Sequence, residues 1–126
     1  MASIRTSAAF TAFAAIAAVP ALAHPKLVAS IPAANATVAA PAAINLDFSE
    51  KLVPRFTGAT VTMTSMPGMA MDKPMAVASA PAYGADGKTV TLKPAKPLTP
   101  GAYRVEWHAV AADTHRTAGA FAFKVR

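Results

Sequence analysis

The chain has 126 residues, a formal net charge of +6 and no cysteine. Without cysteine it can form neither a disulfide nor a thiolate metal site, so its fold has to depend on a hydrophobic core. The basic residues are scattered and lack the clustered stripe that nucleic-acid binding requires. We interpret them as a solvated surface that suits an acidic partner or an anionic membrane face.

Residues 1–23 have the pattern of a secretory signal peptide. Arg5 supplies a weakly basic start, and the apolar run at residues 10–19 is too short to span a bilayer. This length makes an uncleaved anchor or a buried helix the less favoured interpretation. We expect cleavage after Ala23, which leaves residues 24–126 as one domain with its own core.

The rest of the chain has no sustained helical period. Short stretches of alternating apolar and polar residues, separated by Pro, Gly and Asn, predict strands instead. The expected strands are, in chain order, residues 26–31, 43–48, 58–63, 75–79, 89–92, 103–107 and 121–125. About seven short strands predict an all-β fold, a Greek-key barrel or sandwich of the immunoglobulin-like or cupredoxin-like kind. Trp107 is expected in the middle of its core.

The most unusual stretch runs from Met63 to Met75. It holds five methionines, whereas the only other methionine of the chain is Met1. A core uses methionine as an occasional gap filler and does not need this concentration. Prolines and a glycine exclude a regular helix, and thioether sulfur is a soft ligand that selects Cu(I). We therefore expect a loop that binds Cu(I) through Met63, Met66, Met69, Met71 and Met75.

Two of these methionines also have a structural interpretation. Met63 and Met75 fall on the apolar phase of the expected flanking strands, so both could pack in the core at the base of the loop. Met66, Met69 and Met71 lack this explanation and are the stronger candidates for ligands. A structural β-domain whose methionines have no function is disfavoured by their clustering.

Cleavage after Ala23 would make His24 the first residue of the mature chain. A terminal histidine offers its α-amine and its imidazole Nδ1 to one metal ion. Because Pro25 has no amide N–H, the ion cannot go on to displace an amide proton at the second residue. Two nitrogens with further imidazole and carboxylate ligands suit tetragonal Cu(II). The alternative is that His24 simply follows the cleavage site.

Asp113 and His115 are candidate ligands for the same ion. Residues i and i+2 of an extended chain face one side, so both could bind the ion, or Asp113 could orient the imidazole of His115. An Asp-x-His pair is more often surface polarity or a turn near a strand, and its weight here comes from the other copper-like features. His108 alternates with the inward residues of its strand, so we expect it to be solvated rather than a ligand.

The sequence gives little support for an enzyme active site. It has no cysteine nucleophile, no G-x-S-x-G elbow, no paired general acid and base, and no glycine-rich phosphate loop. We therefore expect a binding protein and no enzymatic activity.

Four segments occur together and in a characteristic order: His24-Pro25-Lys26-Leu27-Val28, Met63-Thr64-Ser65-Met66-Pro67-Gly68-Met69, Pro74-Met75-Ala76-Val77, and Trp107 followed by Asp113-Thr114-His115. This combination resembles the CopC family of periplasmic copper-resistance proteins over the whole mature chain. The resemblance implies a small Greek-key β-barrel with copper sites at opposite ends. Cu(II) would bind His24, Asp113 and His115, and Cu(I) would bind Met63, Met66, Met69 and Met75.

One departure from the family pattern concerns the Cu(I) ligands. Family members with this loop often have a histidine between the third and the last methionine, where this chain has Ala70-Met71-Asp72-Lys73 and an additional residue. Met71 as a replacement ligand is therefore a prediction from this sequence and is not carried over from the family. A site made only of thioethers would favour Cu(I) more strongly.

We expect a periplasmic protein that sequesters or carries copper in copper resistance and homeostasis. Oxidation of copper at one site could release it toward the other. The resemblance implies handover to a membrane copper transporter of the CopD type or to a periplasmic copper oxidase. The main alternative is a copper oxidoreductase in which His24 and His115 form a histidine brace, although Asp113 would then fill the space that oxygen needs and the chain is short for a broad substrate face.

Overall fold

The computed structural model describes Thr11, Ala12, Ala14 and residues 24–126, so most of the expected signal peptide lies outside the described residues. The regular elements of the described chain are almost all strands. They are β1 (Leu27–Ile31), β2 (Thr37–Val38), β3 (Ile44–Phe48), β4 (Gly58–Met66), β5 (Met69–Val77), β6 (Ser79–Tyr83), β7 (Thr89–Pro94), β8 (Gly101–Val110) and β9 (Arg116–Val125), with one short 3-10 helix, η1 (Pro54–Phe56). Within these residues no helix has the length and apolar character needed to cross a membrane.

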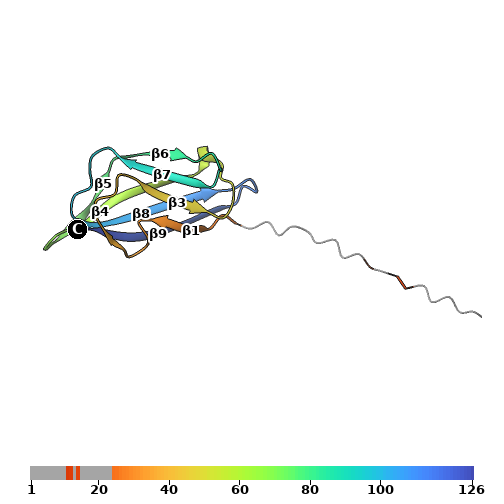
Figure 1. Ribbon diagram of the computed structural model, residues 1–126, viewed down its shortest axis with the longest axis horizontal. Coiled ribbons are helices and arrows are strands. Elements are labelled where there is room, and N and C mark those ends of the chain that lie inside the picture. Colours follow the sequence, from red (N-terminus) through yellow and green to blue (C-terminus); the bar gives the residue numbers. More distant parts are fainter. Residues whose placement is uncertain (1–10, 13, 15–23) are drawn as a thin grey trace, which may run out of the picture.

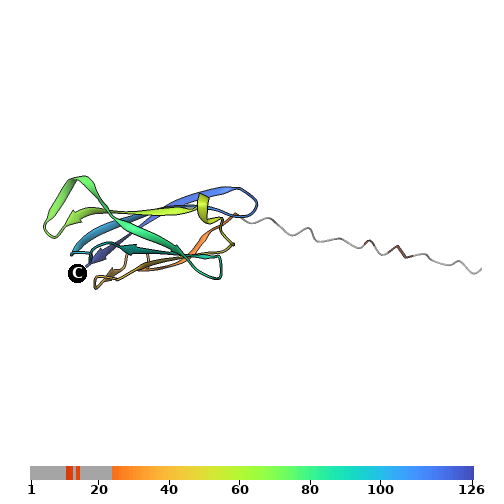
Figure 2. The ribbon, with the colours of Figure 1, turned by 90° about the horizontal axis from the view of Figure 1, so that it is seen from above.

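Two sheets pack face to face (Figures 1 and 2). The four-stranded sheet has the order β1-β3-β7-β6, and the five-stranded sheet has the order β2-β9-β8-β4-β5. All neighbouring strands are antiparallel except β2, which runs parallel to the end of β9. The expected all-β fold is therefore confirmed, as an open sandwich rather than a closed barrel.

Alternating residues of both sheets meet in one core between them. Ile44 and Leu46 of β3 are buried against Tyr103 of β8 and Phe123 of β9, whose rings stack with centroids 5.5 Å apart. The hydroxyl of Tyr103 donates a hydrogen bond to the carbonyl oxygen of Thr99 at 2.6 Å, so its buried polar atom has a partner. The period-two pattern thus identifies the inward residues of the long strands correctly.

Trp107 does not lie in the middle of this core. It is half-buried, and its ring packs edge to face against Phe48 with centroids 5.1 Å apart. Gly119 lies directly opposite on β9, where a Cβ atom would overlap the indole ring. Glycine leaves room for the large ring and offers no side chain to cover it, which explains why the expected central position is wrong.

The strands differ from the expected ones in two respects. Residues 75–79 are not one strand, because β5 ends at Val77, β6 begins at Ser79, and the chain passes at Ala78 from the five-stranded sheet to the four-stranded sheet. There are also nine strands rather than about seven. The two-residue β2 is too short to leave an alternating pattern, and the segment expected as one strand at residues 75–79 is divided between β5 and β6.

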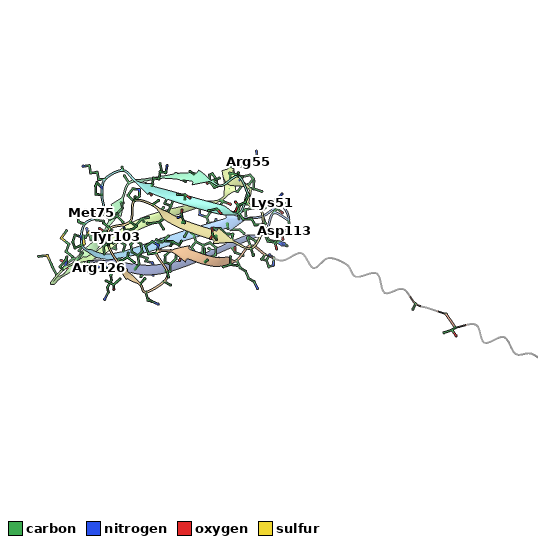
Figure 3. The ribbon with its side chains drawn as sticks, viewed as in Figure 1. Lys51, Arg55, Met75, Tyr103, Asp113 and Arg126 are labelled. Carbon is green, nitrogen blue, oxygen red and sulfur yellow. The ribbon has the colours of Figure 1, made fainter. Side chains whose placement is uncertain are left out.

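β8 connects the two ends of the sandwich that carry the candidate ligands. Its ten residues span about 33 Å. The end beyond Val110 carries the turn with Asp113, and the end near Gly101 carries the β4–β5 hairpin, which projects beyond the body of the sandwich (Figure 2). Figure 3 shows the labelled Asp113 at one end and the labelled Met75, together with sulfur atoms, at the other. We call these the histidine end and the methionine end.

Candidate metal centres

At the histidine end, the three residues that the sequence predicted as ligands of one ion lie close together. Nδ1 of His115 lies 3.2 Å from Oδ2 of Asp113, and Nδ1 of His24 lies 3.9 Å from the same oxygen. The two imidazole rings meet edge to face with centroids 4.6 Å apart. The Asp113 side chain is only 7% exposed, whereas the His24 and His115 side chains are 54% and 63% exposed. A nearly buried carboxylate thus lies between two accessible imidazoles.

The convergence of Asp113 and His115 comes from a turn and not from an extended strand. Thr114 has φ 67°, in the left-handed region, and its N–H donates to the carbonyl oxygen of Ala111 at 2.9 Å. The N–H of His115 donates to Oδ1 of Asp113 at 3.1 Å, which fixes the carboxylate against its own turn. The expected extended geometry is wrong, although the two side chains still reach the same point.

Pro25 holds His24 above this turn. Pro25 is fully buried, and its carbonyl oxygen accepts a hydrogen bond from Oγ1 of Thr117 at 2.6 Å. The neighbouring Lys26 exchanges hydrogen bonds with Ser49 at 2.9 Å through its N–H and its carbonyl oxygen. The sequence analysis missed Thr117, because a contact between residues 92 positions apart leaves no local pattern. These contacts bring the first residue of the expected mature chain within reach of Asp113.

The donor set has the dimensions of a site for one first-row metal ion. One atom from each of the three residues lies within 4.8 Å of the other two. Nitrogen and oxygen ligands bind such ions at about 2 Å, so two ligands of one ion lie at most about 4 Å apart. The two distances to Asp113 already meet this limit. A side-chain movement of about 1 Å, which exposed imidazoles can make by rotation, would bring all three donors within it.

His108 does not belong to this cluster. It lies on the outer face of the five-stranded sheet, opposite Gly58 on β4 and Ala118 on β9. Its ring packs over Gly58, where a Cβ atom would come within 3.0 Å of the imidazole. The outward orientation expected from strand alternation is confirmed. Among the described residues, His108 is in no group of three or more potential metal-binding histidine and acidic side chains.

The methionine stretch is a β-hairpin and not a loop. Strands β4 and β5 are joined by Pro67 and Gly68 alone, and Met66 pairs directly with Met69 across the turn. Gly68 has φ 71°, which suits the third position of a turn with proline before it. The expected loop is therefore wrong because the turn chemistry of Pro-Gly allows both strands to continue to the tip. The exclusion of a helix is confirmed.

The five methionines divide into three environments. Met66, Met69 and Met75 are 40%, 65% and 48% exposed, respectively, whereas Met63 is only 4% exposed and belongs to the core. Met71 is half-buried and packs against the core. The structural interpretation thus holds for Met63 but not for Met75. The three exposed thioethers are free to meet an ion that arrives from solvent.

A register shift explains the additional residue of this segment. Between the pairs Met63–Met75 and Ser65–Ala70, one residue on β4 faces four on β5. The extra residues of β5 therefore bulge from the hairpin and include Met71 and Lys73. Pro74 is tolerated there because β5 is the edge strand of its sheet. The departure from the family pattern noted in the sequence coincides with this bulge.

The chain is similar to known proteins over almost its whole length. Residues 27–126 match the CopC domain family. The chain is 52% identical over 124 residues to copper resistance protein C of Xanthomonas campestris pv. juglandis, covering 98% of this chain and 96% of that protein. It is 53% identical over 118 residues to copper resistance protein C of Pseudomonas syringae pv. tomato, covering 92% and 93%.

A similar solved structure is that of PcoC, described as a methionine-rich copper resistance protein from Escherichia coli. The two structures have a TM-score of 0.76 and 47% sequence identity, over 82% of this chain and 100% of that chain. A second likeness, to CopC from Methylosinus trichosporium OB3b, has a TM-score of 0.69 at 25% identity. With these similarities and a family match over most of its length, the chain is a member of the CopC family.

Proposed function

We propose that this protein binds copper in the periplasm as part of copper resistance and homeostasis, holding Cu(II) at the histidine end and Cu(I) at the methionine end. The observation that carries the proposal is the cluster of His24, Asp113 and His115, whose donor atoms lie within 4.8 Å of one another at one end of the fold. The names of the relatives, copper resistance protein C, support copper as the metal.

The Cu(II) ligands are His24, Asp113 and His115. Removal of residues 1–23 converts the peptide nitrogen of His24 into a primary amine, which adds a fourth donor. Nδ1 is the His24 atom that faces Asp113, and it is also the atom that closes a chelate ring with the amine. Nitrogen and carboxylate donors suit Cu(II), and binding competes with protons because the amine and imidazoles must be neutral.

The Cu(I) ligands come from the five methionines of the hairpin. Met66, Met69 and Met75 are the accessible ones, and Met63 lies directly opposite Met75 at the base of the hairpin. Met71 contributes from the bulge, where the family often has a histidine. Thioether sulfur is uncharged and soft, so this end prefers Cu(I) and holds Cu(II) poorly.

The two ends are about 33 Å apart along β8. An ion that is oxidised at one end must therefore leave the protein before it reaches the other end, and direct passage within one molecule is excluded. We infer that each end exchanges copper separately with its own partner. The candidates are a membrane transporter of the CopD type and a periplasmic copper oxidase.

Copper stoichiometry of the processed protein under reducing and oxidising conditions tests this function. We expect one Cu(I) in the presence of a reductant and one Cu(II) without it. Replacement of Met66, Met69 and Met71 by serine should abolish Cu(I) binding and leave Cu(II) binding unchanged. A residue added before His24 should weaken Cu(II) binding and leave Cu(I) binding unchanged. Protein that binds neither ion would refute the proposal, and equal damage to both sites by either change would refute the two-site arrangement.

The histidine-brace oxidoreductase makes a different prediction. It requires the Cu(II) protein to produce peroxide from oxygen when a reductant is supplied. In the geometry of this site, Oδ2 of Asp113 is near both imidazoles and takes the position that oxygen would need. We therefore expect no peroxide above that released by the same amount of free copper.

A further inference from the structure

We propose that the methionine end is a docking surface for an acidic protein that exchanges Cu(I) with this one. The inference rests on the proposed Cu(I) site and adds the chemistry of the partner. It depends on two features of the surface around the hairpin: an excess of positive charge and two grooves that each combine an exposed methionine with a cation.

The net charge of the described residues is unevenly distributed, because cations lie at both ends of the sandwich whereas most of the acids lie away from the hairpin. Four cationic side chains lie on the hairpin or border the two grooves beside it, namely Lys73, Lys96, Lys124 and Arg126, and Asp72 is the one acid among the described residues there. The remaining acids of the described chain lie elsewhere. Asp47, Glu50, Asp86 and Asp113 are at the histidine end, and Glu106 is midway along β8, where it pairs with Arg104 at 3.1 Å.

Two open grooves flank the hairpin. The first, of about 440 Å³, runs beside Met66 and Pro67 and is bordered by Lys124 and Arg126. The second, of about 360 Å³, runs beside Met75 and is bordered by Lys96, with Leu98 in its lining. Each groove thus offers an apolar floor, an exposed thioether and a cationic rim. A partner that fits them needs acidic groups around a protruding apolar or sulfur-bearing segment.

A protein fits this surface better than a lipid bilayer does. Segments that insert into the membrane interface carry Trp, Phe or Leu on their apolar face, and residues 63–75 contain none of these. Apart from Met69 at the tip, the exposed apolar area around the hairpin includes the two grooves, which a flat bilayer surface would not fill. Anionic phospholipid would complement the positive charge around the hairpin but would leave both grooves empty.

The charge excess should act on the rate of encounter. Complementary charge raises association rates by about 10-fold to 1,000-fold, and the effect weakens as salt shortens the Debye length from about 10 Å at 0.1 M to about 3 Å at 1 M. An acidic acceptor should therefore take Cu(I) from this protein faster than a basic one, with a difference that disappears at high salt.

The test uses two synthetic peptides that each contain one Cys-x-x-Cys pair, one flanked by aspartates and the other by lysines. Transfer of Cu(I) from the loaded, processed protein is followed through the absorption of the Cu(I)–thiolate complex. We expect the aspartate peptide to accept Cu(I) about tenfold faster at low salt, and the two rates to converge at 1 M salt. Equal rates at low salt would overturn the docking proposal.

Two double variants with the same change in net charge locate the effect. Lys96→Glu with Lys124→Glu places one reversed charge on each groove. Lys51→Glu with Lys88→Glu makes the matched change at the histidine end, where Lys51 is labelled in Figure 3 and the carbonyl oxygen of Lys88 accepts from the N–H of Phe48 at the end of β3. The first variant should lose the preference for the aspartate peptide, and the second should keep it. If both variants lose it to the same extent, total charge is responsible and the proposed surface is wrong.

Two further measurements separate the docking proposal from its rivals. Addition of the metal-free aspartate peptide should shift the amide signals of the non-proline residues among 95–102, which line the grooves; shifts confined to the histidine end would contradict the proposal. Sedimentation of the Cu(I)-loaded protein with phosphatidylglycerol vesicles, dependent on Lys96 and Lys124, would replace the acidic protein by a membrane. A processed chain that takes up no Cu(I) would instead refute the proposed function.

Discussion

Replacement of Asp113 by asparagine is the sharpest test of the histidine end. Asparagine has the same shape, and its Oδ1 can still accept the hydrogen bond that the N–H of His115 donates at 3.1 Å. The turn at Thr114 should therefore keep its geometry. What changes is the group near both imidazoles, where a carboxylate oxygen becomes an amide NH₂ at 3.2 Å from His115 and 3.9 Å from His24.

The expected loss follows from charge and geometry. Two unit charges 4 Å apart interact by about 4 kcal/mol at an effective dielectric constant of 20, and a divalent ion doubles this value. Most of this attraction is offset because hydrated Cu(II) and the free carboxylate are both stabilised by water. Loss of a group that binds or orients a metal ligand typically lowers affinity by about 10-fold to 100-fold, or about 1.4 to 2.8 kcal/mol. We expect a change in this range for Asp113→Asn.

The assay is competition of the processed protein with a Cu(II) chelator at neutral pH, with Cu(I) affinity measured in parallel. Cu(I) affinity should be unchanged, because the methionine end is about 33 Å away along β8. The fold is checked by thermal unfolding of the metal-free variant. Cu(II) affinity within twofold of the wild type, in a variant with unchanged Cu(I) affinity and melting temperature, would refute the role of Asp113.

Three other predictions concern stability. Met63→Ala should lower the free energy of unfolding by about 2–5 kcal/mol because Met63 is buried, whereas Met69→Ala at the exposed tip should change it by less than about 0.5 kcal/mol in chemical denaturation. Gly119→Ala should cost about 1–3 kcal/mol and alter Trp107 fluorescence, because the new methyl group overlaps the indole; unchanged stability and fluorescence would contradict this packing. The backbone N–H of Lys88 and the hydroxyl of Thr89 lower the pKa of Asp86 below its ordinary 3.8. Asp86 thus stabilises the fold fully above that ordinary pKa and progressively less as pH falls toward its lower folded pKa, so the difference in melting temperature between wild type and Asp86→Asn should shrink during acidification.

Residue types and local spacing were sufficient for much of the fold, and they also predicted which side chains at its two ends are candidate ligands. The alternation of Ile44, Leu46 and Phe48 identifies the buried face of β3, since side chains of a strand alternate between its two faces. Neither the passage of the chain between sheets at Ala78 nor the half-buried position of Trp107 could be read in this way. Both depend on which strands become neighbours, as Gly119 becomes the neighbour of Trp107.

The sequence by itself determined which residues can bind a soft or a borderline metal, because thioether, imidazole and carboxylate carry their ligand preferences wherever they are placed. Only the tertiary structure decided how these donors meet. Burial of Pro25 and its hydrogen bond to Thr117 bring His24 beside a turn about 90 residues later in the chain. Packing also separates Met63, which fills the core, from Met69, which faces solvent, because burial depends on the neighbours that the sandwich supplies and not on the side chain alone.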